Sequence, residues 1–86
     1  MMYYVYILLL GNNQLYAGRT DDLRRRVLEH TNGKVSATSK RRPLQLVFYE
    51  AFLDKRDAIR RERYFKTSKG KSTLQLMLRE SLSISE

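Results

Sequence analysis

The stretch YYVYILLLGNNQLYAG, residues 3–18, sets the fold. Tyr3–Leu10 contains β-branched, aromatic and leucine side chains with no polar interruption, which predicts a strand buried on both faces at the centre of a sheet. The segment GNNQ predicts a turn, because Gly and Asn tolerate a positive φ. Leu15–Gly18 is then the returning strand of a hairpin.

A helix is expected next, at residues 21–31. Thr20 or Asp21 is the expected N-terminal cap, because a side-chain oxygen there accepts hydrogen bonds from the free amides of the first turn. Asn32-Gly33 is expected to end the helix. The polar, basic connection at 34–43 has room for one short helical turn.

The second half of the chain predicts one strand and two more helices. Leu44–Phe52 has strand character, and a helix at 55–66 is expected to begin with a capping-box arrangement of Asp54 and Asp57. The segment TSKGKS should break this helix, and the terminal SLSISE should fray. The side chains expected to hold a last helix against the body are Leu74, Met77 and Leu78.

The resulting order, β-β-α-α-β-α-α, predicts an α+β fold. We expect a small three-stranded antiparallel sheet flanked by helices, as one domain over residues 1–86 with its core at 3–80. A chain of 86 residues is too short for a deep second core, so a functional site is expected at the surface.

The positive charge of the chain is strong and unevenly spread. The formal net charge is +8, yet the first 18 residues have no charged side chain. Residues 19–71 hold sixteen basic and seven acidic side chains. Such an excess is typical of a polyanion binder, and nucleic acid is the favoured partner. The alternative is a solvated basic surface that keeps the protein soluble.

Composition argues against several other classes of protein. The absence of cysteine excludes disulfides and thiolate metal sites, and a single histidine argues against zinc, so any metal is expected to be a hard cation held by oxygen. The N-terminus lacks the basic region of a signal peptide, and the apolar run 5–10 is far shorter than the roughly 20 residues of a membrane-spanning helix. We therefore expect a cytoplasmic protein that makes no membrane contact.

Three consecutive arginines in the first helix are not equivalent. At about 100° per residue, Arg26 and His30 border the apolar stripe of Leu23, whereas Arg24 and Arg25 point toward solvent. Arg26 is either an arginine whose stem lies along the core edge or a functional group. His30 is either a packed, hydrogen-bonded side chain or a group that takes part in chemistry.

Glu62 lies in the middle of an apolar helix face formed by Ala58, Ile59 and Phe65. A carboxylate there costs free energy unless another group pairs with it. One interpretation is a buried ion pair with Arg26 or Lys66. The other is a hard-metal ligand or general base at the bottom of a cleft.

The turn length determines whether Tyr6 and Tyr16 share a face of the sheet. A two-residue turn places them on opposite faces, and a three-residue loop places them on the same face with Gly18 opposite Tyr6. On a shared face, Gly18 would allow backbone or substrate to approach closely. The residue pattern by itself favours opposite faces, with these tyrosines filling the core or an interface.

The ordered series of motifs resembles the GIY-YIG nuclease domain. It consists of Tyr4-Val5-Tyr6, then Tyr16-Ala17-Gly18, an arginine eight residues and a histidine twelve residues past that glycine, and Glu62 on a later helix. The segment GKVSATSKRRPLQLVFYEAF is similar to the small stand-alone bacterial members, which are related to the nuclease domain of an excision-repair enzyme. In this chain Tyr4-Val5 replaces Gly-Ile, and Ala17 replaces isoleucine.

The resemblance implies a three-stranded antiparallel sheet flanked by helices and a metal-dependent DNA endonuclease. The implied activity is phosphodiester hydrolysis that nicks structured or single-stranded DNA during repair or recombination. The implied catalytic residues are Tyr6, Tyr16, Arg26, His30 and Glu62. Glu62 would hold one divalent cation, Mg²⁺ or Mn²⁺, and Tyr16 or Tyr6 would receive the proton of the attacking water.

The expected partner is DNA, with RNA as a second candidate, bound by a monomer or weak homodimer. The alternative function is a non-catalytic nucleic-acid-binding or assembly module that retains the nuclease fold. A purely structural domain would leave the position of Glu62 unexplained. The residues expected to contact the nucleic acid without reading bases are Gly18, Arg19, Lys34, Lys40, Arg41, Arg42, Lys66, Lys69 and Lys71.

Overall fold

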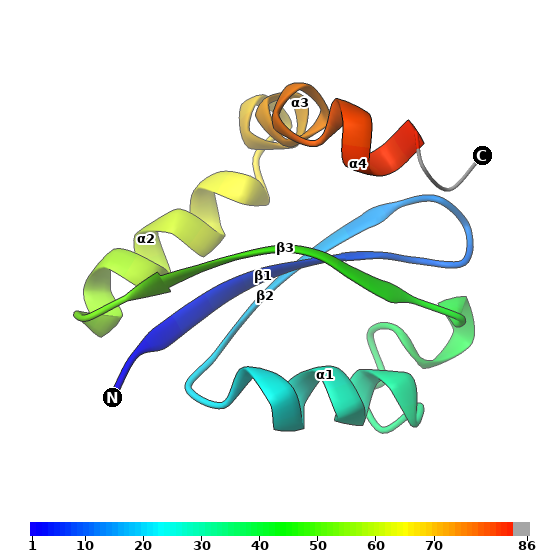
Figure 1. Ribbon diagram of the computed structural model, residues 1–86, viewed down its shortest axis with the longest axis horizontal. Helices are drawn as coiled ribbons and strands as arrows, with labels where there is room; N and C mark the ends of the chain where they lie inside the picture. Colours follow the sequence, from blue (N-terminus) through cyan, green and yellow to red (C-terminus); the bar gives the residue numbers. More distant parts are fainter. Residues whose placement is uncertain (84–86) are drawn as a thin grey trace.

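The structure, a computed structural model, describes residues 1–83 and has the predicted α+β architecture (Figure 1). Three antiparallel strands form one sheet in the order β2-β1-β3. The element order is the predicted one, except that the last helix is followed by a further short helix. The elements are β1 (Tyr3–Leu9), β2 (Leu15–Thr20), α1 (Leu23–Thr31), the 3₁₀ turn η1 (Ser39–Arg41), β3 (Gln45–Phe52), α2 (Lys55–Phe65), α3 (Ser68–Met77) and α4 (Arg79–Ser83).

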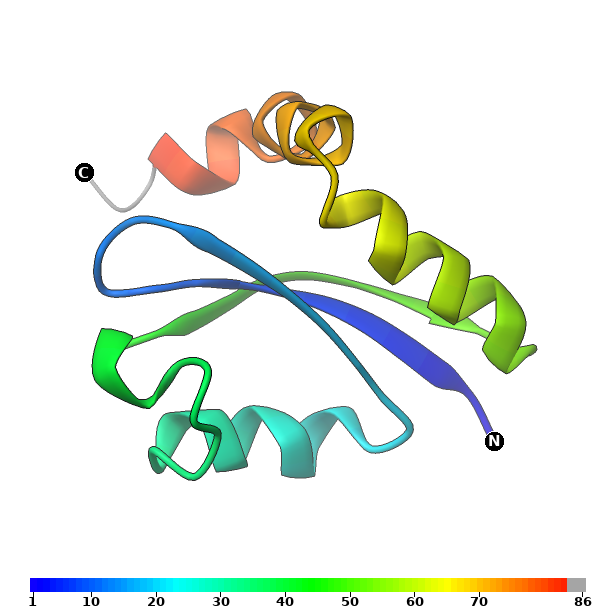
Figure 2. The same ribbon diagram turned by 180° about the vertical axis from the view of Figure 1, so that it is seen from behind.

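Helices cover both faces of the sheet, with α1 on one side and α2 to α4 on the other, as the view from behind in Figure 2 also shows. Strand β1 is central, as predicted, and its alternating side chains enter two cores. Val5 and Ile7 pack with Phe65 of α2 and Leu74 of α3. The second core contains three fully or nearly fully buried residues and lies on the α1 side: Tyr6, Leu8 and Leu10.

Two helix starts differ in detail from the predictions. The cap of α1 is Asp22, whose carboxylate accepts from the backbone N–H of Arg25 (3.1 Å), and not Thr20 or Asp21. The Thr20 hydroxyl instead accepts from the N–H of Asp22 (3.0 Å), which holds the cap in place. Asp54 does cap α2, but it accepts from the N–H of the second residue after it rather than forming a capping box.

The segment TSKGKS ends α2 but also begins α3. Thr67 caps α3 by accepting from the N–H of Gly70 (3.0 Å), so the new helix starts inside the predicted break. A Cβ at Gly70 would lie 1.9 Å from the carbonyl oxygen of Tyr64, which means that α2 and α3 meet backbone to backbone at this point.

Leu74 and Leu78 are buried as predicted, but Met77 is 42% exposed, so its predicted role in packing is wrong. Helix α3 ends at Met77 and α4 begins at residue 79, a change of direction that the 100° spacing does not include. Residues 81–83 of the terminal SLSISE are helical, and residues 84–86 lie outside the described part of the chain. Within residues 1–83, the helices are too short or too polar to cross a membrane.

Candidate active site at the edge of strand β2

Leu10 and Gln14 continue the pairing beyond the ends of β1 and β2, so the loop itself has three residues, 11–13. The backbone N–H of Leu10 donates to the carbonyl of Gln14 (2.9 Å), and the N–H of Asn13 donates back to the carbonyl of Leu10 (2.9 Å). Asn13 adopts a φ of 67°, the left-handed conformation that Asn tolerates better than most residues. The side chain of Asn12 accepts from the N–H of Gln14 (3.1 Å) and supports the same loop.

This loop brings Tyr6 and Tyr16 to the same face of the sheet. Tyr6 pairs with Gly18 and Leu8 pairs with Tyr16, so all four side-chain positions face α1. The opposite-face arrangement that the residue pattern favoured is therefore wrong. A Cβ at Gly18 would lie 2.3 Å from the Tyr6 hydroxyl, so the missing side chain makes room for the Tyr6 ring rather than for an open approach.

His30 is fully buried and connects the two tyrosines. Its Nε2 is 2.8 Å from the Tyr6 hydroxyl, and its Nδ1 is 2.7 Å from the hydroxyl of Thr38. The Tyr6 and Tyr16 rings meet the imidazole edge-on at centroid distances of 5.5 and 5.4 Å. Burial lowers the pKa of His30, and the charge of Arg26 lowers it further. The imidazole is therefore neutral at pH 7, with one nitrogen donating and the other accepting.

Tyr6 is 1% exposed, so its hydroxyl has little access to water. Burial raises the pKa of Tyr6 above its ordinary value, although a hydrogen bond and the positive charge of Arg26 act in the opposite direction. The phenol is therefore held in its protonated form at neutral pH. In this position Tyr6 orients His30 and supports the site from within the core.

Arg26 lies at the edge of the α1 core stripe, as the helical spacing predicts, with a side chain that is 37% exposed. Its guanidinium donates to Glu29 (3.0 Å). The pKa of Arg26 is raised, chiefly by Glu29 and also by Tyr6. Together with Arg19, Arg25 and other residues it lines a polar hollow of about 320 Å³, where an anion would meet several guanidinium groups.

Glu62 is 18% exposed and pairs with two cations across the edge of β2. One carboxylate oxygen accepts from Nε of Arg19 (3.2 Å), and the other lies 3.2 Å from Nζ of Lys66. The predicted pair with Lys66 is present, but Arg26 is not the partner, because it pairs with Glu29 on its own helix. Each carboxylate oxygen of Glu62 therefore lies next to a positive charge, which offsets the cost of partly burying it.

Tyr16 is half-buried and faces the same group of charges. Nζ of Lys66 lies 5.9 Å from the centroid of its ring. Tyr16, Lys66 and Lys71 line a hollow of about 290 Å³ between β2 and the α2–α3 junction. Unlike Tyr6, Tyr16 is therefore open to a small molecule or a nucleic-acid strand.

Comparison with known proteins identifies the family to which this fold belongs. A family model described as the GIY-YIG catalytic domain matches residues 2–75. This chain belongs to the GIY-YIG family. The match spans both tyrosine motifs, Arg26 and Glu62, and the family is one of nuclease domains.

Several small bacterial proteins resemble this GIY-YIG chain over most of its length. A UPF0213 protein from Lactiplantibacillus plantarum is 38% identical over 85 residues, covering 95% of this chain and 84% of that protein. One from Clostridium perfringens is 40% identical over 82 residues, covering 94% and 88%. The solution NMR structure of a UPF0213 protein from Bacillus halodurans has 36% identity and a TM-score of 0.59, over 90% of this chain and 85% of that one.

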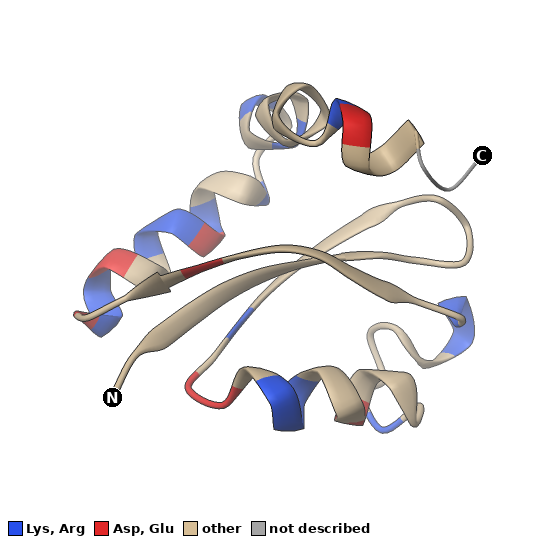
Figure 3. Ribbon diagram, viewed as in Figure 1, with Lys and Arg blue, Asp and Glu red and all other residues tan. Residues whose placement is uncertain are grey.

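Figure 3 shows basic residues along α1 and α2 as well as around them, and most of those predicted to contact nucleic acid fall into two groups. Arg19, Lys66 and Lys71 gather around Glu62 and Tyr16. The other group lies on the connection between α1 and β3, and two of its members form hydrogen bonds within the fold. Its members are Lys34, Lys40, Arg41 and Arg42; Lys69 is exposed on α3.

Two arginines on the connection between α1 and β3 stabilise the fold. Arg41 donates to the side chain of Gln14 (3.1 Å) and to the carbonyl of Ala37, which ties η1 to the β1–β2 loop. Arg42 donates to the carbonyls of Ser39 (3.0 Å) and Thr31 (3.3 Å). These two arginines therefore hold the connection in place even without a nucleic acid.

Sequence reasoning did not identify Thr38 or the environment of Arg61. Thr38 is fully buried, yet it lies among several hydroxyl residues in a polar segment, and no local signal separates it from them. The guanidinium carbon of Arg61 lies 4.3 Å from the centroid of the Phe65 ring, and Arg61 donates to both carboxylate oxygens of Glu50 (2.8 and 3.1 Å). Both features depend on contacts between distant segments.

Proposed function

We propose that this GIY-YIG domain is a divalent-metal-dependent endonuclease that hydrolyses phosphodiester bonds in DNA. The observation that supports this most directly is the position of Glu62. A carboxylate on an otherwise apolar helix face is held at the edge of β2 between Arg19 and Lys66, next to the accessible Tyr16. Acidic, basic and phenolic groups therefore converge where a phosphate can reach them.

The donor set at Glu62 fits a hard cation. Within residues 1–83 no group of three or more histidine, cysteine or carboxylate side chains is suited to a metal ion. Mg²⁺ commonly binds through one or two carboxylates and completes its shell with water and substrate phosphate. Glu62 would hold Mg²⁺ or Mn²⁺ in this way. When bound, the cation would neutralise charge on the scissile phosphate and on the leaving 3′ oxygen.

Arg19, Arg26 and Lys66 bind and stabilise the phosphate. Arg26 donates charge-assisted hydrogen bonds to its nonbridging oxygens as negative charge develops there. Arg19 and Lys66 balance Glu62 in the free protein and can turn toward the phosphates of a bound strand. Arg19 and Lys66 thus pair with Glu62 in the free protein and with phosphate in the complex with nucleic acid.

Tyr16 accepts the proton of the attacking water, because it is accessible while Tyr6 is buried. The proton acceptor is the phenolate form of Tyr16, which neighbouring cations such as Lys66 stabilise. His30, which is hydrogen-bonded to Tyr6, packs against the Tyr16 ring and positions it. Water attacks phosphorus as its proton passes to the Tyr16 phenolate, the bond to the 3′ oxygen breaks, and the leaving 3′ oxygen takes a proton from solvent. The products are a 5′-phosphate and a 3′-hydroxyl.

The test is a cleavage assay on supercoiled, branched and single-stranded DNA with Mg²⁺ or Mn²⁺. We expect Arg26→Ala and Glu62→Gln to reduce the cleavage rate by about 10²–10³-fold. Tyr16→Phe should reduce it more than Tyr6→Phe. The matched controls are Arg79→Ala and Glu80→Gln, two exposed positions on α4.

Nicking that survives Glu62→Gln would contradict the proposal, because it would come from a contaminant or from another site. Tight, salt-sensitive DNA binding without cleavage of any substrate would favour the non-catalytic binding module. Equal losses in Tyr6→Phe and Tyr16→Phe would contradict the assignment of Tyr16 as the proton acceptor.

A further inference from the structure

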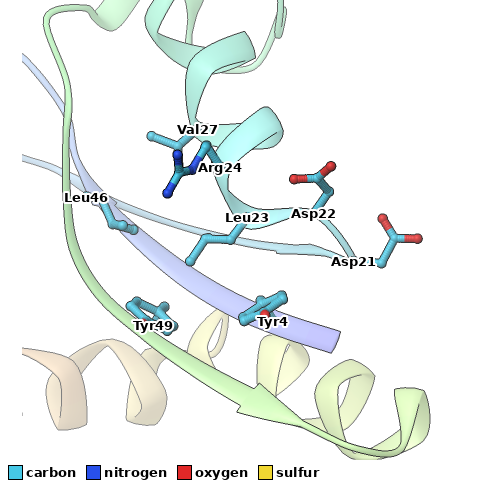
Figure 4. Close-up of a pocket in the computed structure, with 8 residues that line it drawn as sticks. All are labelled: Tyr4, Asp21, Asp22, Leu23, Arg24, Val27, Leu46 and Tyr49. Atoms are coloured by element: carbon cyan, nitrogen blue, oxygen red, sulfur yellow. The ribbon is translucent and has the colours of Figure 1, made fainter. Parts of the chain in front are cut away.

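An aromatic hollow lies on the α1 face of the sheet, beside the proposed active site (Figure 4). Its volume is about 540 Å³. Tyr4, Tyr49 and Leu46 of the sheet form one side of it, and Leu23 and Val27 of α1 form the other. Asp21, Asp22 and Arg24 complete the lining at the start of α1. Hollows of this size are typical of small-molecule or base-sized ligands.

Tyr4 and Tyr49 form an aromatic surface within this hollow, in which Tyr4 is partly buried and Tyr49 is exposed. Their ring centroids are 6.1 Å apart in an edge contact, and Tyr49 is 53% exposed although it lies on a sheet face that α1 covers elsewhere. Tyr49 also pairs across the sheet with Tyr6, so the hollow adjoins the tyrosine and histidine pair described above. Neither ring is used by the proposed reaction.

A second observation indicates what enters this hollow. The polar hollow of Arg19, Arg25 and Arg26 shares Asp21 with it, at the turn between β2 and α1. A cationic hollow beside an aromatic one matches a nucleotide, whose phosphate is charged and whose base is flat and apolar. Single-stranded nucleic acids are commonly bound in this way, with phosphates on basic groups and bases stacked on aromatic rings.

We propose that this hollow binds one unpaired base of the nucleic-acid substrate, stacked against Tyr49. This inference rests on the proposed function and narrows it to substrates with an unpaired nucleotide next to the cleaved phosphate. A base within a continuous duplex is covered by its neighbours and cannot enter, so the hollow discriminates by strand structure rather than by sequence.

The test compares binding of a labelled single strand with binding of a duplex of equal length, at one ionic strength and without divalent cation. Tyr49→Ala should weaken single-strand binding about tenfold and leave duplex binding unchanged. Tyr49→Phe should bind like the wild type, because the ring is retained. Leu76→Ala is the matched control, an exposed apolar residue on α3. A 2-aminopurine in the strand should be quenched by the wild type and not by Tyr49→Ala.

Tyr49→Ala that binds the single strand as tightly as the wild type would overturn the inference, and so would an equal loss for strand and duplex. Because Tyr49→Phe keeps the ring and removes only the hydroxyl, weak binding by this variant as well would assign the effect to the hydroxyl rather than to stacking and would also overturn the inference. Tyr49-dependent strand binding together with no cleavage in the separate assay with Mg²⁺ or Mn²⁺ overturns the nuclease function but leaves the base-binding hollow intact.

Discussion

At the scale of single residues, burial changes the chemical role of side chains that look alike in the sequence. Tyr6 and Tyr16 belong to equivalent-looking motifs, but the Tyr6 hydroxyl is enclosed with His30, and Tyr16 faces a hollow. His30 is a satisfied core histidine that also touches both tyrosines. A residue can therefore belong to the site without contacting the substrate.

The buried imidazole predicts a pH dependence of stability. The pKa of His30 is lowered from 6.5 in the folded protein, so the unfolded chain binds a proton more readily. The free energy of unfolding should therefore fall as the pH drops from 7 through about 6.5 toward the folded-state pKa. Urea unfolding at several pH values measures this slope, and His30→Gln should remove most of it. An unchanged slope in that variant would assign the effect to other groups.

At the scale of elements, the packing of α2 against α3 depends on one glycine. Gly70→Ala would improve helix propensity by about 0.5–1 kcal/mol, but its Cβ would collide with the Tyr64 carbonyl at 1.9 Å. The collision should dominate and lower the free energy of unfolding by about 1–3 kcal/mol. Thermal unfolding measures the difference. Ser72→Ala, at an exposed position on the same helix, is the control and should be neutral or slightly stabilising. A stabilised Gly70→Ala protein would show that the helices separate at little cost.

At the scale of the whole molecule, the positive charge surrounds a sheet whose central strand has no charged side chain. Nucleic-acid affinity should therefore fall steeply with salt, and a plot of log affinity against log salt should be linear. Lys71→Gln should reduce the slope by about 1, because one phosphate contact is lost. Arg79→Gln removes a cation already paired with Glu80 and should change the slope less. Affinity that does not depend on salt would contradict a phosphate-binding surface.

The sequence by itself determined the elements and their order as far as α3. A continuous apolar run, a Gly/Asn turn, capping carboxylates and helical spacing are local signals, and they predicted the central strand, the placement of Arg26 at a core edge and the anomaly at Glu62. The series of motifs indicated the family because it depends only on residue types and spacing. These features need no knowledge of which distant segments meet.

Only the tertiary structure decided how those residues combine. The conformation of Asn13 sets the register that places Tyr6 and Tyr16 on one face, where one residue more or less in the loop reverses every side chain. The pairing of Glu62 with Arg19 joins positions 43 residues apart. The burial of Thr38 against His30 and the hollow at Tyr49 likewise form only when α1 packs on the sheet. Contacts between distant segments follow from packing of the whole chain, and local sequence carries no direct record of them.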